Sequence, residues 1–361
     1  MLRPHQWLIV VVLASPCCAQ LQSLGFAPGL YPQSFASGVT GDGSLVVGTS
    51  GHPAVLGQAA VTWSAANGLT ALPHLPGSGN PVYSSANAVS GDGRRVVGDS
   101  RGTATLWTDG QPMAIAGGFG GATAITPDGV VVAGHHEGRA FRWTAQNGME
   151  YLSGLDPSRV SHASAISADG SVIVGQIGSE GFPNYSAFRW TAATGPVFLP
   201  NQTTSADASA DASILYGDMP GQAYRWTIGG GLQPLGMFGV LPTRAKACTA
   251  DGGTMVGLAD NALGGIAMIW DAAHGFRTMD SFLMANGVDT SGWTLAAGTG
   301  ISDDGRTICG YGTDPQGSNA GWIATIPEPG TAGVAACWMW VSHRRRRRRP
   351  GVAAPPKELA V

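Results

Sequence analysis

The chain repeats one pattern seven times between Leu21 and Ile326, and this period constrains the fold more than any other feature. The copy at 165–200, AISADGSVIVGQIGSEGFPNYSAFRWTAATGPVFLP, shows the unit at full length. Relatives of its first half begin at Gly38, Ala88, Ala124, Asp207, Ala247 and Gly300, the copy from Asp207 being the weakest. A period of this length is typical of solenoids, propellers and arrays.

Each copy contains four short β-prone runs separated by turn signals, which predicts a four-stranded antiparallel meander. Such a meander cannot cover both of its faces alone, and radial packing of neighbours covers them while leaving only short edges. The seventh copy ends at Ile326 without a fourth strand, whereas LQSLG from Leu21 is a strand without a copy. We therefore predict an all-β, seven-bladed β-propeller over residues 20–326 whose last blade is closed by the N-terminal strand.

An Asp-Gly turn joins the first two runs of most copies, because glycine adopts positive φ at little cost. The aspartates are Asp42, Asp92, Asp128, Asp169, Asp251 and Asp304. Their repetition favours a structural role over calcium binding or catalysis, which needs carboxylates that converge once. In the fifth copy Ala212 follows Asp211, and a left-handed alanine costs about 1 kcal/mol or more, so we expect a different turn there.

A tryptophan ends the third run of six copies, and we predict that it lies on a buried surface between blades. These residues are Trp63, Trp107, Trp143, Trp190, Trp226 and Trp270. In the seventh copy, Trp322 is shifted by one position toward the start of the strand, so the sequence does not determine on which side of the sheet its side chain lies.

The copies differ mainly in the loops after the second and fourth runs, which leave the ring at the end opposite the Asp-Gly turns. The longer loops are residues 50–58, 76–85, 177–186, 258–265, 279–292 and 311–319. This elaborated end is the candidate binding surface. Within it, Met279, Phe282 and Leu283 have helical spacing and Gly287 follows as a stop, which predicts one short helix.

Residues 1–19 have the pattern of a cleaved secretory signal: Arg3 and His5, an apolar run from Trp7 to Ala14, and small residues before Gln20. Lipidation at Cys17 is the alternative.

Six of the twenty basic residues form the run Arg344–Arg349, so the central body has about ten more acidic than basic residues. Such a body repels phosphate backbones, and we expect no nucleic-acid partner; a basic nucleic-acid patch is the alternative for the arginine run alone.

Two cysteines remain once the leader and the tail are set aside, Cys248 and Cys309. Both stand at positions that valine or isoleucine fills in other copies, so we expect buried apolar side chains, with a disulfide between adjacent blades as the alternative. We expect the one histidine cluster, His135-His136-Glu137, in the turn between the second and third strands of blade three, on the elaborated end. A metal site needs three or four convergent ligands, whereas adjacent residues of a strand point apart. We therefore predict no metal, no cofactor and no catalytic residue.

The repeats resemble the HAF-type extracellular repeats, on the motifs AISADGSVIVG and AFRWT. That resemblance implies an exported, surface- or matrix-associated propeller. The tail resembles PEP-CTERM sorting signals: Pro327, Glu328 and Pro329, then an apolar segment, then the arginines Arg344, Arg345, Arg346, Arg347, Arg348 and Arg349. The resemblance implies recognition by an exosortase-like enzyme and transient membrane association through residues 327–349. Residues 350–361 extend beyond the pattern of these signals, and we expect them to form a disordered tail.

The leading hypothesis is an exported, non-enzymatic binding or scaffold module whose partner is an extracellular glycan or protein. The alternative is a secreted polysaccharide-active hydrolase or lyase on the same scaffold. Polar residues that occur once, rather than in every copy, and that converge on one pocket would distinguish the two. The first to inspect are Asp260, Asp314, Glu180, Tyr185 and His136.

Overall fold

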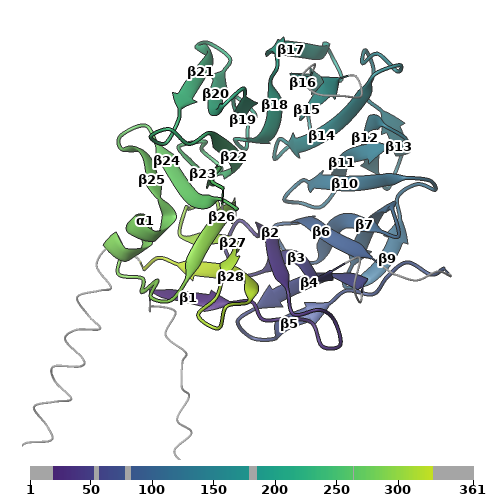
Figure 1. The fold of residues 1–361 in the computed structure, drawn as a ribbon. Coiled ribbons are helices and arrows are strands. Elements are labelled where there is room, and N and C mark those ends of the chain that lie inside the picture. The colour runs from purple at the N-terminus through teal and green to yellow at the C-terminus, as the bar shows by residue number, and fades with distance from the viewer. Residues whose placement is uncertain (1–18, 53–56, 78–82, 179–184, 263, 328–361) are drawn as a thin grey trace, which may run out of the picture. The chain divides into compact units, whose positions relative to one another are not determined.

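The computed structural model describes residues 19–52, 57–77, 83–178, 185–262 and 264–327. Residues 20–326 form one compact unit. In it, seven four-stranded antiparallel sheets surround a central axis as the blades of a propeller (Figure 1). The predicted fold class is confirmed.

The first four blades follow the order of the chain. Blade one contains β2 (Ser34–Val39), β3 (Val46–His52), β4 (Gly57–Ser64) and β5 (Gly68–Ala71). Blade two contains β6 (Ser84–Val89), β7 (Arg95–Ser100), β8 (Thr103–Thr108) and β9 (Gln111–Ala114). Blade three contains β10 (Gly120–Ile125), β11 (Val131–His136), β12 (Arg139–Thr144) and β13 (Gly148–Tyr151). Blade four contains β14 (Val160–Ile166), β15 (Val172–Gly178), β16 (Ser186–Thr191) and β17 (Gly195–Asn201).

The last three blades complete the ring. Blade five contains β18 (Thr204–Ala208), β19 (Ile214–Met219), β20 (Gln222–Thr227) and β21 (Gly231–Gly236). Blade six contains β22 (Thr243–Cys248), β23 (Thr254–Ala259), β24 (Ile266–Asp271) and β25 (Gly275–Thr278). Blade seven contains β26 (Thr294–Ile301), β27 (Thr307–Thr313), β28 (Asn319–Thr325) and β1 (Gln20–Ser23).

The ring closes where β1 pairs with β28, as predicted: the purple strand β1 lies beside the yellow-green β28 in Figure 1. The pairing is antiparallel and runs from Gln20 opposite Thr325 to Ser23 opposite Trp322. On its other side, β28 pairs with β27 of the same blade. The Gly321 amide of β28 also donates to Oγ of Ser34 in blade one at 2.9 Å, so β28 contacts two segments from the beginning of the chain, β1 and Ser34.

The Asp-Gly turns are built around a buried hydroxyl that precedes the aspartate by two residues. In blade four, Ser167 Oγ donates to Asp169 at 2.6 Å and accepts from the Val172 amide at 2.9 Å, while Gly170 has φ of +69°. The corresponding hydroxyls are Thr40, Ser90, Thr126, Ser167, Ser209, Thr249 and Ser302, all 5% exposed or less. Each hydroxyl satisfies an amide that the strand ladder leaves unpaired.

The expectation of a different turn in blade five is wrong. Ala212 adopts φ of +48°, and its turn keeps the hydrogen bonds of the others: Ser209 Oγ to Asp211 at 2.7 Å and the Ser213 amide to Asp211 at 3.0 Å. The methyl group of Ala212 is fully buried in a cluster shared by blades four and five. Burial of this methyl group opposes the strain of the left-handed backbone.

The repeated tryptophans lie between blades. Trp63, Trp107, Trp143 and Trp190 are at most 8% exposed, whereas Trp226 and Trp270 are half-buried. Trp190 packs in one cluster with residues of blade three, and its Nε1 donates to Ser153 O at 2.9 Å. Each blade thus places an aromatic ring against the blade before it.

Trp322 stands two positions, not one, before the site of the other tryptophans. Ala324 pairs with Ile308 as Trp63 pairs with Val46, and Trp322 pairs with Gly310 as Phe141 pairs with Gly134. Because side chains alternate along a strand, a shift of two keeps the same face. Trp322 is accordingly fully buried.

The predicted short helix is confirmed as α1 (Met279–Ala285), which follows blade six. Thr278 caps its start by accepting from the Ser281 amide, and Gly287 follows its end with φ of +80°. Met279 and Leu283 are fully buried. Within the part of the chain that the structure describes, no helix combines the length and apolar character that a bilayer crossing needs.

Candidate functional site

The propeller has two ends with different chemistry. We call the end formed by the Asp-Gly turns the turn face, and the end formed by the loops after the second and fourth strands the loop face. A central channel of about 420 Å³, lined by the first strands of all seven blades, lies along the axis. A second cavity, the side pocket of about 340 Å³, lies on the loop face among residues of blades four, five and six.

Every first strand carries a β-bulge, and the bulged residues form a ring in the channel wall. They are Ser37, Asn87, Thr123, Ser164, Ala206, Lys246 and Thr299. Several donate to a carbonyl of the next blade: Asn87 to Ala122 at 2.9 Å, Thr123 to Ala163 at 2.8 Å, Ser164 to Ser205 at 3.1 Å, and Thr299 to Ala36 at 2.8 Å. The ring links adjacent blades, and Ala206 and Lys246 depart from its pattern.

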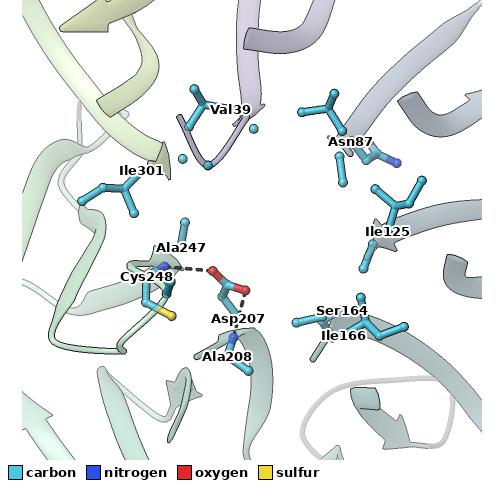
Figure 2. Close-up of a pocket in the computed structure, with 18 of the residues that line it drawn as sticks. Val39, Asn87, Ile125, Ser164, Ile166, Asp207, Ala208, Ala247, Cys248 and Ile301 are labelled. Atoms are coloured by element: carbon cyan, nitrogen blue, oxygen red, sulfur yellow. Dashed lines mark hydrogen bonds between the residues drawn. The ribbon is translucent and has the colours of Figure 1, made fainter. Parts of the chain in front are cut away.

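The residue after each bulge also lines the channel, and blade five is the exception there too. Six blades have alanine or glycine: Gly38, Ala88, Ala124, Ala165, Ala247 and Gly300. Blade five has Asp207, whose carboxylate accepts from the amides of Cys248 and Ala208, both at 2.8 Å (Figure 2). Burial raises the pKa of Asp207 to about 6, against the effect of these hydrogen bonds.

The side pocket gathers polar side chains that are not part of the repeated turns or core, although Asp218 has a counterpart in Asp99 of blade two. Its walls include Gln176, Tyr185, Gln202, Asp218, Gln222, Arg244 and Asp260. Amides, carboxylates and a guanidinium together supply donors and acceptors in several directions. The volume lies at the small end of the range for small-molecule sites, about 300 to 1,000 Å³.

Backbone contacts position the blade-four wall of the side pocket. The carbonyl of Tyr185 accepts from the amides of Gln202 at 2.7 Å and Thr203 at 3.2 Å. The ring of Tyr185 lies against Gly178, where a β-carbon would come within 2.4 Å of the ring. Gln202 itself has φ of +66°, a conformation that non-glycine residues rarely adopt.

Charges on blades five and six face each other across the pocket. Asp218 accepts from the Ala245 amide at 2.9 Å; burial raises the pKa of its carboxyl, while that hydrogen bond and the charges of Lys246 and Arg244 oppose the rise. Arg244 Nε lies 2.6 Å from Asp260 Oδ2. Because this pair is partly exposed, it contributes little to stability and mainly orients the two side chains.

The residues that the sequence singled out for inspection only partly converge. Tyr185 and Asp260 line the side pocket together. His136 lies elsewhere, with Nδ1 2.8 Å from the Tyr151 hydroxyl, and the nearly buried Asp314 accepts from the Gln316 and Ser318 amides. Glu180 falls outside the described residues.

The histidine cluster spreads out as the strand geometry requires. His135 stacks on His162 of blade four, with ring centroids 4.4 Å apart, while Glu137 accepts from the Phe119 amide. Burial lowers the pKa of His135 to about 4 and also lowers that of His162.

Cys248 and Cys309 are buried free thiols. Among the described residues, no three side chains of the metal-binding types gather in one place.

The sequence did not single out Asp207 and Lys246 of the channel, nor Asp218, Arg244 and the three glutamines of the side pocket. Alignment of the seven copies would have marked Asp207, since it opens the weakest copy at a position where the others have alanine or glycine. Of the predicted sorting signal, Pro327 is the last described residue; Glu328, Pro329 and Arg344–Arg349 lie outside, as do residues 1–18 of the predicted leader.

Comparison with known proteins supports the scaffold. No family model matches the chain, and no curated protein matches it. An oligogalacturonate lyase solved in complex with manganese is similar in structure, with a TM-score of 0.56, 15% identity, and coverage of 87% of this chain and 95% of that chain. A prolyl endopeptidase structure gives a TM-score of 0.56 and 12% identity over 82% of this chain and 49% of that chain. At these identities the similarity is one of fold, and the chain shares the β-propeller architecture with both.

Proposed function

We propose that this protein is an exported, non-enzymatic binding module of the cell surface or extracellular matrix, and that its side pocket binds a saccharide. One observation carries the proposal. Three glutamine amides, two carboxylates, a guanidinium and Tyr185 line a single cavity on the loop face. None of these side chains belongs to the repeated set that forms the turns and the inter-blade core.

A saccharide suits this lining better than an apolar ligand. Adjacent sugar hydroxyls both donate and accept, and the side chains of Gln176, Gln202 and Gln222 each offer a donor group and an acceptor group. Asp218 and Asp260 add acceptors, and Tyr185 offers a flat apolar surface with a polar tip. The half-buried site would exchange hydrogen bonds with water for hydrogen bonds with hydroxyls.

Export is part of the same proposal. It rests on the leader at residues 1–19 and on the order of Pro327, Glu328 and Pro329, an apolar segment and Arg344–Arg349. Positive charge after an apolar segment stays on the cytoplasmic side, which would hold the tail in place for an exosortase-like enzyme. The mature protein would then remain at the surface or in the matrix.

The alternative is a polysaccharide-active enzyme, which we retain because one protein of the same fold is named as an oligogalacturonate lyase. One experiment distinguishes the two candidates. The full chain should be applied to an array of extracellular polysaccharides and their oligomers, and bound species then analysed for cleavage. Retention without new reducing ends or unsaturated products supports a binding module, whereas product formation supports the enzyme and contradicts our proposal.

A further inference from the structure

The channel carries a feature that the propeller fold does not require. Asp207 replaces an alanine or glycine that serves in the other six blades, so the turn, the bulge and the strand pairing form without a carboxylate. A carboxylate in this position is desolvated, which opposes folding in its charged form. Perturbed acids that face a cavity are candidates for function.

The carboxylate is held in a fixed orientation. Its two oxygens accept from the amides of Ala208 and Cys248, and the Cys248 thiol also hydrogen-bonds to it. Since a carboxylate has about four acceptor positions, one remains for a donor that enters the channel. Figure 2 shows the carboxylate pointing toward the space enclosed by the first strands.

Apolar side chains surround that space. Val39, Val89, Ile125, Ile166 and Ile301 line the channel one position after the small residues of their blades. In Figure 2 the labelled members of this belt encircle the same opening as Asp207. The site therefore combines an apolar belt with one fixed anionic acceptor.

Among the described residues, Asp207 forms no ion pair with a cationic side chain. Asp303 also lines the channel and raises the pKa of Asp207 further, and burial raises the pKa of the Cys248 thiol, so the thiol stays neutral. Lys246 lines the channel as well, and its charge acts on Asp218. The lining thus holds two carboxylates and one ammonium group.

We propose that the channel binds a small organic cation, with its ammonium group donating to Asp207 and its hydrocarbon body lying against the apolar belt. Charge-assisted hydrogen bonds of this kind are shorter and stronger than neutral ones. A divalent metal fits less well, because calcium takes six to eight oxygen ligands. This site is separate from the side pocket, so it does not depend on the proposed saccharide function.

The test is calorimetric titration of the full chain with cyclohexylammonium, and with cyclohexanol as the neutral analogue of equal size. We expect saturable binding of the ammonium at neutral pH and binding about tenfold or more weaker for cyclohexanol. Asp207→Ala, which restores the residue of other blades, and Asp207→Asn, which keeps the shape, should each weaken ammonium binding by a similar factor. Affinity should also fall as the pH drops below about 6, because Asp207 then binds a proton.

A matched control is Asp169→Asn on the turn face, which should leave the affinity for cyclohexylammonium unchanged. The absence of saturable binding by the wild-type chain would overturn the proposal. So would wild-type affinity for cyclohexylammonium in both Asp207 variants, or binding of cyclohexanol by the wild type as tight as its binding of cyclohexylammonium. Competition by calcium chloride at matched ionic strength, lost in Asp207→Asn, would reassign the channel to a metal ion.

Discussion

The turn face and the loop face of this propeller differ in how their polar residues are used. On the turn face, the same hydroxyl and carboxylate recur in every blade and hydrogen-bond within their own turn, as Ser167 and Asp169 do. On the loop face, Tyr185 and Asp260 occur in one blade each, and they meet Asp218 in one cavity. Residues in register satisfy the backbone of one blade, while single residues from different blades can surround a ligand.

Blade five shows the same contrast within one blade. Its turn keeps the shared geometry even with Ala212 in place of glycine. Its first strand, by contrast, departs from the pattern of the channel, with Ala206 in the bulge ring and Asp207 beside it. The shared hydrogen bonds thus tolerate a costly substitution, whereas the channel wall has changed its chemistry.

The largest expected effect concerns the shared core. Trp190→Ala should lower the free energy of unfolding by about 3 to 5 kcal/mol, because it opens a cavity between blades three and four. Trp226→Ala is the matched comparison and should cost less, since Trp226 is half-buried. Chemical denaturation measures both, and equal midpoints for Trp190→Ala and wild type would show that the inter-blade assignment is wrong.

Next comes the hydroxyl of the shared turn. Ser167→Ala removes the acceptor of the buried Val172 amide and a donor to Asp169, and should cost about 1 to 3 kcal/mol. Ser171→Ala, on the exposed side of the same turn, should change stability by less than about 0.5 kcal/mol. If denaturation gave the two variants the same stability, the buried hydroxyl would have no special role.

The single acid of blade five should be visible in the pH dependence of stability. The pKa of Asp207 is about 6 in the folded protein, which exceeds its value in the unfolded chain. Its contribution to the stability of the folded state is therefore greatest below about pH 4 and is lost as the pH rises through about 6. As the pH falls from about 7 to about 5, the free energy of unfolding of the wild type should rise by on the order of 1.4 kcal/mol relative to that of Asp207→Asn. His135 acts in the opposite sense: its lowered pKa gives stability that is lost as pH falls from about 6.5 toward 4.

Denaturation at a series of pH values, repeated in a His135→Gln background, separates these two contributions. The difference between wild type and Asp207→Asn should persist in that background. A difference that does not vary with pH would mean that Asp207 is not a buried carboxylate of raised pKa.

The smallest effect concerns the turn glycines. Gly305→Ala should cost about 1 kcal/mol from its positive φ alone, because its nearest neighbour lies 3.5 Å from the added carbon. Gly170→Ala should cost more, since its added carbon would lie 2.7 Å from Val131 of the neighbouring blade. We expect a lower melting temperature for Gly170→Ala than for Gly305→Ala, and the reverse order would contradict this account of the turns.

The sequence predicts the fold because its signals are local and repeated. The Asp-Gly turns, the tryptophan spacing and LQSLG at the N-terminus were enough to give seven blades and the closing strand β1. The role of Ser167 was missed, although the hydroxyl recurs in every copy, because its burial depends on the turn geometry.

The sites were harder to predict, because they depend on which blades lie side by side. Tyr185 and Asp260 could be singled out as non-repeated residues, but Asp218, Arg244 and the glutamines join them only through the packing of blades four to six. Asp207 opens the weakest copy, and the sequence does not show that this position faces the central channel. The shift of Trp322 by two positions likewise follows only from the strand register.

The central claim is that single residues of the loop face bind the ligand while the repeated residues of the turn face hold the fold. The most direct test is the affinity of the full chain for the saccharide retained best on the array, compared among Asp218→Asn, Asp260→Asn and Asp169→Asn. We predict that the two side-pocket variants lose about tenfold or more in affinity and that Asp169→Asn binds as the wild type does. Equal affinity in all three variants, or loss in Asp169→Asn alone, would contradict the claim.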